Sequence, residues 1–591
     1  MHLFHAQNSL KMGANPFLSQ AIREFHHHYI VPPHRGGMEI IMNETKGINR
    51  AKFYQLALFP MNNGATNVYF VLILSYIATF GNKVLALGMV FASFMVTGMR
   101  VFDAITDPII GAIMDKTDGK FGKFRPFMVI GNIVMAVAVI ALYILTPFVP
   151  ASMMWLRYLL FVLLYAVWVI GYTFQTSVTR SAQSVLTNDP KQRPLFTVFN
   201  TIASLVGMGA MQFIGPIIAG NNIAGDYNQT WFAIMTPIGV VISIVLTVLA
   251  IIGIWEKDQT KYFGIGGQQE QLKLREYVDI VKHNKPLQRL MVAGGGCKLA
   301  LSIATNLTVL CMLYGCMTQF GTHIEMLPSA ADPNVLVETV VSDNHYDNLY
   351  LIMMVMGYVF SAPFFLLTVR TSQKHGQKKS LMTYVAVAFA SYIGVLVMLL
   401  LWKFGDPAWN LSIFEGTLFG PDFKITINLY TILFIIFFGI GYGAYYATAD
   451  MPIPMVADCA DYETYRSGKF IPGIMGTLFS LVDKLVSSLS ATVVSVALLF
   501  IGVKDLPTKA TPYVDGMNWV VIALFCLVPM LAWALTLFAM KGYSLDGKRI
   551  KTIQAVNAAR KAAVANGMSM EEAMATITDE TVTANKEDQQ G

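Results

Sequence analysis

Long apolar segments recur along almost the whole chain and constrain its fold more than any other feature. A run of about 20 mainly apolar residues can cross a bilayer as one α-helix. From Phe53 onward there are roughly twelve such runs by this criterion. Charged residues make up only 13% of the 591 residues, whereas about 25% is usual in soluble domains. The sequence therefore predicts an all-α polytopic membrane protein.

The predicted spans form two halves on either side of a polar, charged connection at 256–287. The N-terminal half is 51–255 and the C-terminal half is 288–541, with about six spans in each. Residues 1–50, which include three consecutive histidines, are predicted to be a disordered extension. The spans lie at about 53–80, 85–113, 127–148, 155–181, 195–220, 229–255, 288–319, 347–369, 380–402, 427–449, 470–501 and 516–540.

The connections on one side of the predicted bundle are rich in lysine and arginine, including Lys123, Arg125, Lys378 and Lys379. The connections on the other side hold few basic residues, such as Lys83. Cytoplasmic loops carry the excess of Lys and Arg, so the basic side is predicted to be cytoplasmic. Both termini then lie in the cytoplasm, and we expect a multi-pass protein of the cell (inner or plasma) membrane.

Two connections on the other side, about 320–346 and 403–426, are long and contain turn formers and aromatic residues. They could cap the outer mouth, but we expect them to be solvated loops. The tail at 542–591 has two short helical patterns, near 555–565 and 568–577, and is predicted to be cytoplasmic.

A pair of acidic residues interrupts the second span. Asp103 and Asp107 are four residues apart, so a helix places them on one face, one turn apart. Each charge in hydrocarbon costs about 3 kcal/mol or more, and the pair needs a cationic companion. The companion is Arg100, a proton or a metal ion. One interpretation is a structural ion pair between Arg100 and Asp103, and the other is a cation-coupling site in a transporter.

Several motifs accompany these acids. Arg100-x-x-Asp103-x-x-x-Asp107-Pro108 leads into Gly122-Lys-Phe-Arg-Pro126. Tyr172-Thr173 lies in the fourth span, Met455-Val-Ala-Asp458-x-x-Asp461-Tyr462 follows the tenth, and Lys484 lies in the eleventh. In this order they resemble the glycoside–pentoside–hexuronide:cation symporter family over about 50–540. The resemblance implies a major facilitator fold, in which two six-helix halves bind the substrate near the midplane.

The resemblance implies that Asp103, Asp107 and Thr173 form the cation site. Thr106 lies beside them, at a position where the family pattern has an asparagine. Such a site could hold Na⁺, or one carboxyl could carry H⁺ instead, so the coupling cation stays open between these two. Lys484 matches a lysine that pairs with the acids when the site is empty. No other cofactor is expected.

A cytoplasmic gate is implied as well. Lys123 and Arg125 would pair with Asp458 and Asp461 when the cytoplasmic side is closed, and would release them when it opens. The alternative is that these basic residues only set the topology.

The substrate positions depart from the family pattern. Two acids are replaced by Asn62 and Thr176, a tryptophan by Arg180, and an arginine by Asn200. Amides and hydroxyls suit polyols, and arginine can hold a carboxylate, so we favour an acidic sugar such as a uronide. Alternatively Arg180 only pairs with Asp458 or Asp461. Asp450 could neutralise Arg180, or it could restore an acid to the site from the other half. The predicted substrate-binding residues are Asn62, Asn63, Arg100, Tyr172, Thr176, Arg180, Asn200 and Lys484.

Other functional classes fit the sequence less well. It has no nucleotide-binding glycine loop, no HExxH pair and no Ser-His-Asp arrangement, so an enzyme is not expected. A sodium-coupled lysolipid carrier of the same fold would need an apolar slot open to the bilayer, and the polar substrate set disfavours it. A non-transporting sensor would be expected to lose the paired acids. We expect a monomer whose partners are a small sugar or glycoside and the lipid bilayer, with no nucleic acid.

Overall fold

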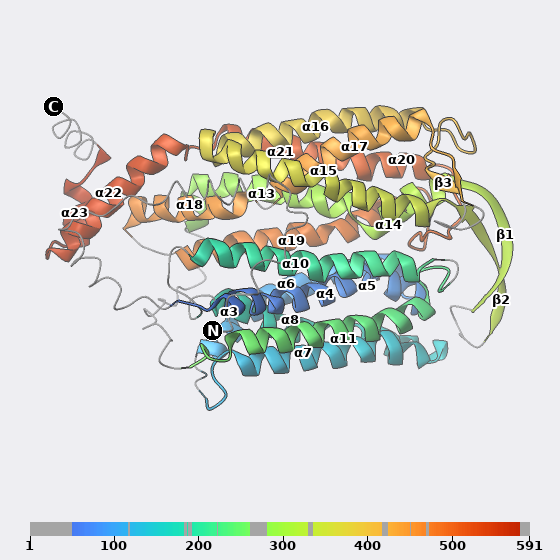
Figure 1. Ribbon diagram of the computed structural model, residues 1–591, viewed down its shortest axis with the longest axis horizontal. Helices are drawn as coiled ribbons and strands as arrows, with labels where there is room; N and C mark the ends of the chain where they lie inside the picture. Colours follow the sequence, from blue (N-terminus) through green and yellow to red (C-terminus); the bar gives the residue numbers. More distant parts are fainter. Residues whose placement is uncertain are drawn as a thin grey trace, which may run out of the picture.

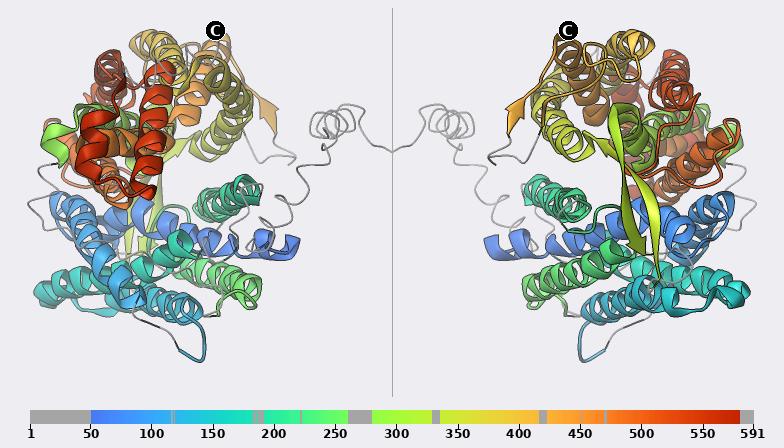
Figure 2. Two further views of the ribbon diagram at one scale, coloured as in Figure 1. Left: turned by 90° about the vertical axis from the view of Figure 1, so that its left-hand side faces the viewer. Right: turned by 90° about the vertical axis from the view of Figure 1, so that its right-hand side faces the viewer.

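The computed structural model describes residues 50–579 apart from 116, 118, 183–185, 187–191, 221–222, 260–279, 329–334, 416–422, 450 and 469–471. Within these residues the chain is mainly helical, and the helices form two groups with their long axes in a common direction (Figure 1). One group contains the helices before the central connection and the other contains those after it. The end views separate the two groups in the same way (Figure 2).

The N-terminal group begins with a broken helix and continues with five longer ones. A Pro at the start of α4 and two π-helical turns interrupt the first span. The elements are α3 (Phe53–Leu58), α4 (Met61–Phe70), η2 (Val71–Ser75), α5 (Ile77–Thr79), η3 (Phe80–Val84), α6 (Met89–Asp115), α7 (Arg125–Ile140), η4 (Ala141–Leu145), η5 (Thr146–Phe148), η6 (Ala151–Met153), α8 (Met154–Ser181), α10 (Gln192–Ile218) and α11 (Gln229–Ile254).

The C-terminal group has a similar sequence of helices, followed by two helices of the tail. Its elements are α13 (Lys285–Ala304), α14 (Leu307–Tyr314), η8 (Cys316–Thr318), β1 (Gln319–Pro328), β2 (Leu336–Asn344), α15 (Tyr346–His375), α16 (Gln377–Leu401), β3 (Phe414–Glu415), β4 (Lys424–Ile425), α17 (Leu429–Thr448), α18 (Pro452–Ser467), α19 (Pro472–Leu499), α20 (Met517–Val521), η9 (Ile522–Leu527), α21 (Val528–Lys541), α22 (Gly547–Ala565) and α23 (Met570–Thr576).

The helices have the length and hydropathy that membrane spans require. Among the described residues, 10 helices qualify singly, and α13 with α14 forms a further span bent by 47°. The remaining predicted span corresponds to α10, whose apolar part Ile202–Ile218 is shorter. The prediction of a polytopic helical membrane protein is therefore confirmed.

Helix α6 shows how the bilayer orients a span that carries charge. Val101, Ile105 and Ile109 recur every four residues on one face and are exposed, as a surface in contact with lipid requires. On the opposite face Arg100 and Asp103 are buried, with 7% and 1% of their surface accessible. The apolar face is turned outward and the charged face is turned inward, toward the neighbouring helices.

Close helix contacts within the N-terminal group depend on pairs of glycines. A Cβ atom added at Gly131 of α7 would lie 2.8 Å from the Gly171 carbonyl oxygen of α8. A Cβ at Gly207 of α10 would lie 2.1 Å from the Gly64 carbonyl oxygen of α4. Neither pair leaves room for a side chain, so small residues set the spacing of these helices.

The two connections expected to be solvated loops contain antiparallel hairpins. Strand β1 pairs with β2 from Gln319↔Asn344 to Pro328↔Leu336, and β3 pairs with β4 over two residues each. The longer hairpin crosses the end of the molecule from the C-terminal group toward the N-terminal group (Figures 1 and 2). The Gln319 side chain fixes its base, because its amide donates to the Thr511 carbonyl and its oxygen accepts from the Tyr513 amide.

The tail helices lie at the other end of the molecule, beyond α18 (Figure 1). Helices α22 and α23 cover the two helical patterns in the tail sequence. A capping box at Ser569 starts α23, where the hydroxyl accepts from the Glu572 amide and the Glu572 carboxylate accepts from the Ser569 amide. Residues 1–49, predicted to be an extension, lie outside the described residues.

Candidate functional site

One lysine bridges the paired acids. Lys484 Nζ lies 2.8 Å from Asp103 Oδ2 and 2.6 Å from Asp107 Oδ2. The acids belong to α6 in the N-terminal half, and the lysine belongs to α19 in the C-terminal half. A single ammonium therefore joins the two carboxylates to each other and the two halves to one another.

Arg100 supplies the second positive charge. Its Nη1 lies 3.1 Å from Asp103 Oδ2, and its guanidinium lies 5.3 Å and 5.8 Å from the ring centroids of Phe70 and Tyr172. Two carboxylates and two cations give this cluster a net charge of zero. Such pairing makes buried charges tolerable within a bilayer. The predicted Arg100–Asp103 ion pair is present, but it is only one part of a four-residue cluster.

Two threonines add oxygen atoms next to the acids. Thr173 Oγ1 of α8 donates to Asp103 Oδ1 at 2.9 Å, and Thr106 Oγ1 lies 3.3 Å from Thr173 Oγ1. Thr106 also donates to the Asp103 carbonyl at 3.0 Å. Carboxylate and hydroxyl oxygens are the ligands that hard cations prefer. The four residues predicted for the cation site therefore lie together, with Asp107 joined to the others through Lys484.

The predicted substrate residues of α4 contact α8 and α10. Asn62 is fully buried, and its Nδ2 donates to the Gln175 carbonyl at 2.9 Å and to Thr179 Oγ1 at 2.7 Å. Asn63 Nδ2 donates to the Asn200 carbonyl at 3.3 Å. In this conformation these amides hold three helices of the N-terminal half together, and their contact with a substrate stays a prediction.

Thr176 and Tyr172, also predicted to bind the substrate, contact neighbours within α8. Thr176 is half-buried and donates to the Tyr172 carbonyl at 2.9 Å within α8, and the Tyr172 ring stacks on Trp168 at 5.1 Å. Asp450 and the Arg180 side chain lie outside the described part of the chain. The proposed roles of these two residues therefore rest on the sequence.

Arg125, predicted for the cytoplasmic gate, pairs with an acid that the sequence did not single out. Its Nε lies 3.2 Å from Asp258 Oδ2, just beyond the end of α11. The Asp258 carboxylate also accepts from the backbone amides of Lys123, Phe124 and Arg125 at 2.8 to 3.1 Å. Gly122 has φ +85°, and a Cβ there would lie 2.2 Å from Asp258 Oδ2. The Gly-Lys-Phe-Arg motif is therefore shaped around this buried carboxylate.

The acids predicted for the gate lie on α18. The Asp461 carboxylate accepts from Gln554 Nε2 of α22 at 2.9 Å, and its carbonyl accepts from Asn557 Nδ2 at 2.9 Å. Arg125 and Asp461 are thus each engaged by residues other than their predicted partner. The tail helix α22, to which the sequence assigned no such role, thus contacts one of the carboxylates predicted for the gate.

The sequence also missed a set of contacts that join the halves at the hairpin end. The Tyr227 and Tyr346 hydroxyls lie 2.8 Å apart. Thr508 Oγ1 donates to Asp226 Oδ2, and the Leu506 amide donates to Asn82 Oδ1 at 2.7 Å. Burial raises the pKa of the Asp226 carboxyl above its ordinary value. The partners are separated by more than a hundred residues, so local sequence patterns give no sign of them.

Comparison with known proteins identifies the family. The model of the MFS/sugar transport protein family matches residues 59–324 and 336–547. The inner membrane symporter YicJ of Escherichia coli is 23% identical over 503 residues, which is 84% of this chain and 92% of that protein. The symporter YjmB of Bacillus subtilis is 22% identical over 442 residues, covering 74% and 80%.

A relative that is named for a sugar also aligns with much of this chain. The lactose permease of Lactobacillus delbrueckii is 22% identical over 467 residues, which is 78% of this chain and 64% of that protein. Among solved structures, a mutant of the nucleoside transporter NupG has a TM-score of 0.50 at 11% identity, covering 83% of this chain and 100% of that one. This likeness shows the fold alone, a major facilitator fold. The chain is a multi-pass membrane transporter rather than an enzyme, and it belongs to the MFS/sugar transport protein family.

Proposed function

We propose that the protein is a symporter that couples the entry of a sugar or glycoside to Na⁺ or H⁺. One observation carries this proposal: Lys484 of the C-terminal half lies against both Asp103 and Asp107 of the N-terminal half. Relatives named as symporters and sugar carriers support it, including a lactose permease and a raffinose carrier protein.

The charge balance of the cluster explains how coupling would arise. If Lys484 moved away without a replacement, both carboxylates would lose a cation that lies within 3 Å of each. Breaking a buried ion pair by removing one partner costs about 3–5 kcal/mol. A bound Na⁺ or a proton on one carboxyl restores the balance and frees the lysine. The two halves can then separate at this point only when the coupling cation is bound.

The contacts at the two ends of the molecule support an inward-facing assignment for this conformation. At the hairpin end the halves are joined through Tyr227–Tyr346 and Asp226–Thr508. At the other end Arg125 pairs with Asp258, within the N-terminal half. Alternating access would break the first set of contacts and form the predicted pairs of Lys123 and Arg125 with Asp458 and Asp461.

The substrate is proposed to bind the N-terminal half through the amides and hydroxyls of α4, α8 and α10. These groups can both donate to and accept from sugar hydroxyls. The replacement of a family tryptophan by Arg180 adds a cation to this region. We therefore propose that sugars with a carboxylate are preferred over their neutral counterparts.

Uptake into proteoliposomes tests the proposed function. A panel of neutral glycosides and uronides is offered with a Na⁺ gradient, a pH gradient or neither. Asp103→Asn and Asp107→Asn should abolish concentrative uptake while leaving the proteins folded. Asp515→Asn, the same change at an exposed loop position, should leave uptake intact. Unchanged gradient-driven uptake in both variants of the paired acids would refute the coupling role.

A further inference from the structure

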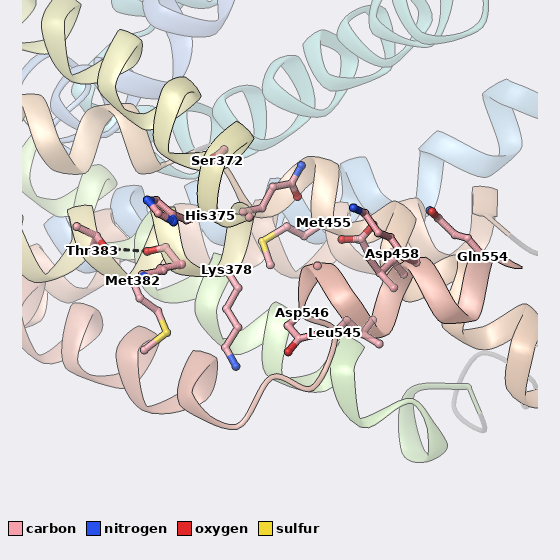
Figure 3. Close-up of a pocket in the computed structure, with 16 residues that line it drawn as sticks. Ser372, His375, Lys378, Met382, Thr383, Met455, Asp458, Leu545, Asp546 and Gln554 are labelled. Carbon is pink, nitrogen blue, oxygen red and sulfur yellow. Dashed lines mark hydrogen bonds between the residues drawn. The ribbon is translucent and has the colours of Figure 1, made fainter. Parts of the chain in front are cut away.

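A cavity lies where the tail meets the C-terminal half. Its volume is about 820 Å³, and its walls come from the end of α15, the start of α16, α18 and residues 545–554 of the tail (Figure 3). This volume is in the range of small-molecule sites, about 300–1,000 Å³. The cavity is separate from the Asp103–Lys484 cluster, because none of the four residues of that cluster lines it.

Positive charge accumulates at the α16 side of this cavity. Helix α16 begins after Gly376, which has φ +87° and provides no side-chain cap. Lys378 and Lys379 lie in the first turn, which holds no acidic residue. The N-terminus of a helix is already electropositive, so acids are favoured there and lysines are not. An anion bound at this turn would relieve the repulsion and accept from the free backbone amides.

Gln377 lines this cavity too. Its half-buried side-chain amide can both donate and accept hydrogen bonds.

The other walls of the cavity add a third lysine and polar side chains that can bind the hydroxyls of a polyol. Lys551 of α22 and His375 of α15 line the cavity, so its lysines come from the tail as well as from the helix bundle. Asp458 and Gln554 lie toward one end in Figure 3, and His375 and Thr383 lie toward the other. Carboxylate and amide oxygens accept hydrogen bonds from sugar hydroxyls, whereas lysines bind an anionic group.

We propose that this cavity binds a phosphate ester that carries hydroxyl groups and so bridges the tail to the C-terminal half. The phosphate would bind Lys379 and Lys551 beside the first turn of α16, and the hydroxyls would bind Gln377, Asp458 and Gln554. A soluble sugar phosphate and the headgroup of phosphatidylglycerol share this chemistry. Setting the topology requires lysines on this side of the membrane, but it does not require that Lys551 and Lys379 line the same cavity.

The bound ester would act on transport through the tail. Helix α22 is docked on α18 by Gln554 and Asn557, which bind Asp461, and by Arg560 Nη1, which donates to the Tyr465 carbonyl at 2.7 Å. Strengthening this docking keeps Asp461 from the proposed gate and slows the cycle. This consequence rests on the proposed function, whereas binding itself does not.

Binding is measured by calorimetry on the full-length purified protein, so the result is independent of uptake. Glucose 6-phosphate is the probe, with glucose and inorganic phosphate as comparisons. Lys379→Gln and Lys551→Gln should each weaken the affinity for glucose 6-phosphate about tenfold, since each removes one charged contact. Lys561→Gln, the same change at an exposed position of α22, should leave the affinity unchanged.

Measurements in nanodiscs distinguish a soluble sugar phosphate from the phosphatidylglycerol headgroup as the ligand. If phosphatidylglycerol occupies the cavity, adding it to phosphatidylcholine discs should lower the apparent affinity for glucose 6-phosphate in the wild type but not in Lys551→Gln. If the soluble ester is the ligand, the affinity is the same in both lipids. The proposal is overturned if glucose 6-phosphate does not bind saturably in either lipid, if inorganic phosphate binds as tightly, or if Lys561→Gln weakens binding as much as the other two changes.

Discussion

Lys484 Nζ lies 2.6 Å from Asp107 Oδ2, although 377 residues separate the two along the chain. The contact joins α19 to α6 and thereby the C-terminal half to the N-terminal half. Asp103 shares the same ammonium at 2.8 Å. One ammonium therefore links the two halves through a pair of carboxylates.

Replacement of Lys484 should lower the stability of the protein. If Na⁺ is the coupling cation, added Na⁺ should restore that stability. Lys484→Ala removes the ammonium that contacts both carboxylates, and we expect a loss of about 3–5 kcal/mol in unfolding free energy without Na⁺. Thermal unfolding over a Na⁺ series should show a larger stabilisation in Lys484→Ala than in the wild type. The exposed Lys504→Ala serves as the control. Equal responses to Na⁺ in all three proteins would exclude a Na⁺ site at these acids.

Replacement of Asp258 should destabilise the N-terminal half where α11 meets the start of α7. Asp258 is 1% exposed and accepts from three consecutive backbone amides and from Arg125. Asp258→Ala leaves these donors unsatisfied, and we expect a loss of about 2–4 kcal/mol, measured by denaturant unfolding in detergent. The neighbouring Glu256 forms an exposed ion pair with Lys52, so Glu256→Ala should cause no measurable loss. Similar behaviour of the two variants would argue against the capping role.

Closure of the hairpin end should depend on pH through Asp226. Burial raises the pKa of this carboxyl above its ordinary value of 3.8, and the nearby Thr508, Lys509 and Lys83 offset only part of the effect. A raised pKa means that the closed state favours the proton. The stabilisation is complete below pH 3.8 and is lost as the pH rises through the raised value.

Distances between spin labels placed on the two halves at the hairpin end report this closure. In the wild type the closed population should fall as the pH rises through the raised pKa. Asp226→Asn is uncharged at every pH, so its closed population should not change over this range. A wild-type population that is constant with pH, or a variant that follows the wild type, would remove Asp226 from the closure.

Arg180→Ala should discriminate between acidic and neutral substrates. If the guanidinium binds a carboxylate, its loss should raise the KM for a uronide about tenfold or more while changing the KM for the neutral glycoside little. Uptake of both substrates by the same preparation gives the comparison. Equal losses for the two would indicate that Arg180 acts in another way, such as pairing with Asp458 or Asp461.

Local sequence spacing predicted the two carboxylates of the site, and the resemblance to the symporter family predicted the lysine that contacts them. The four-residue spacing of Asp103 and Asp107 places both on the buried face of α6, because the bilayer turns the Val101–Ile105–Ile109 face outward. No local pattern could connect them to Lys484, and only its match to the family position did so. The spans were predictable because hydrocarbon excludes all but continuous apolar helices.

Other contacts were beyond sequence reasoning because they are tertiary. Asp258 lies in a charged connection, where an acid is usually solvated, and only the fold places three backbone amides around it. The hairpin β1–β2 did leave a signal, since Leu336–Asn344 is rich in valine, which favours strands. That signal was outweighed by the turn formers between the strands.

The most direct test of the coupling proposal is the movement of the cation itself. Proteoliposomes containing the wild-type protein are given an outward or inward gradient of a transported sugar, with no initial Na⁺ or pH gradient, and the flux of Na⁺ or H⁺ is recorded. The proposal predicts that the sugar gradient drives one of these cations in the same direction, and that Asp103→Asn and Asp107→Asn abolish the flux. Movement of the sugar down its gradient without any accompanying cation would contradict it.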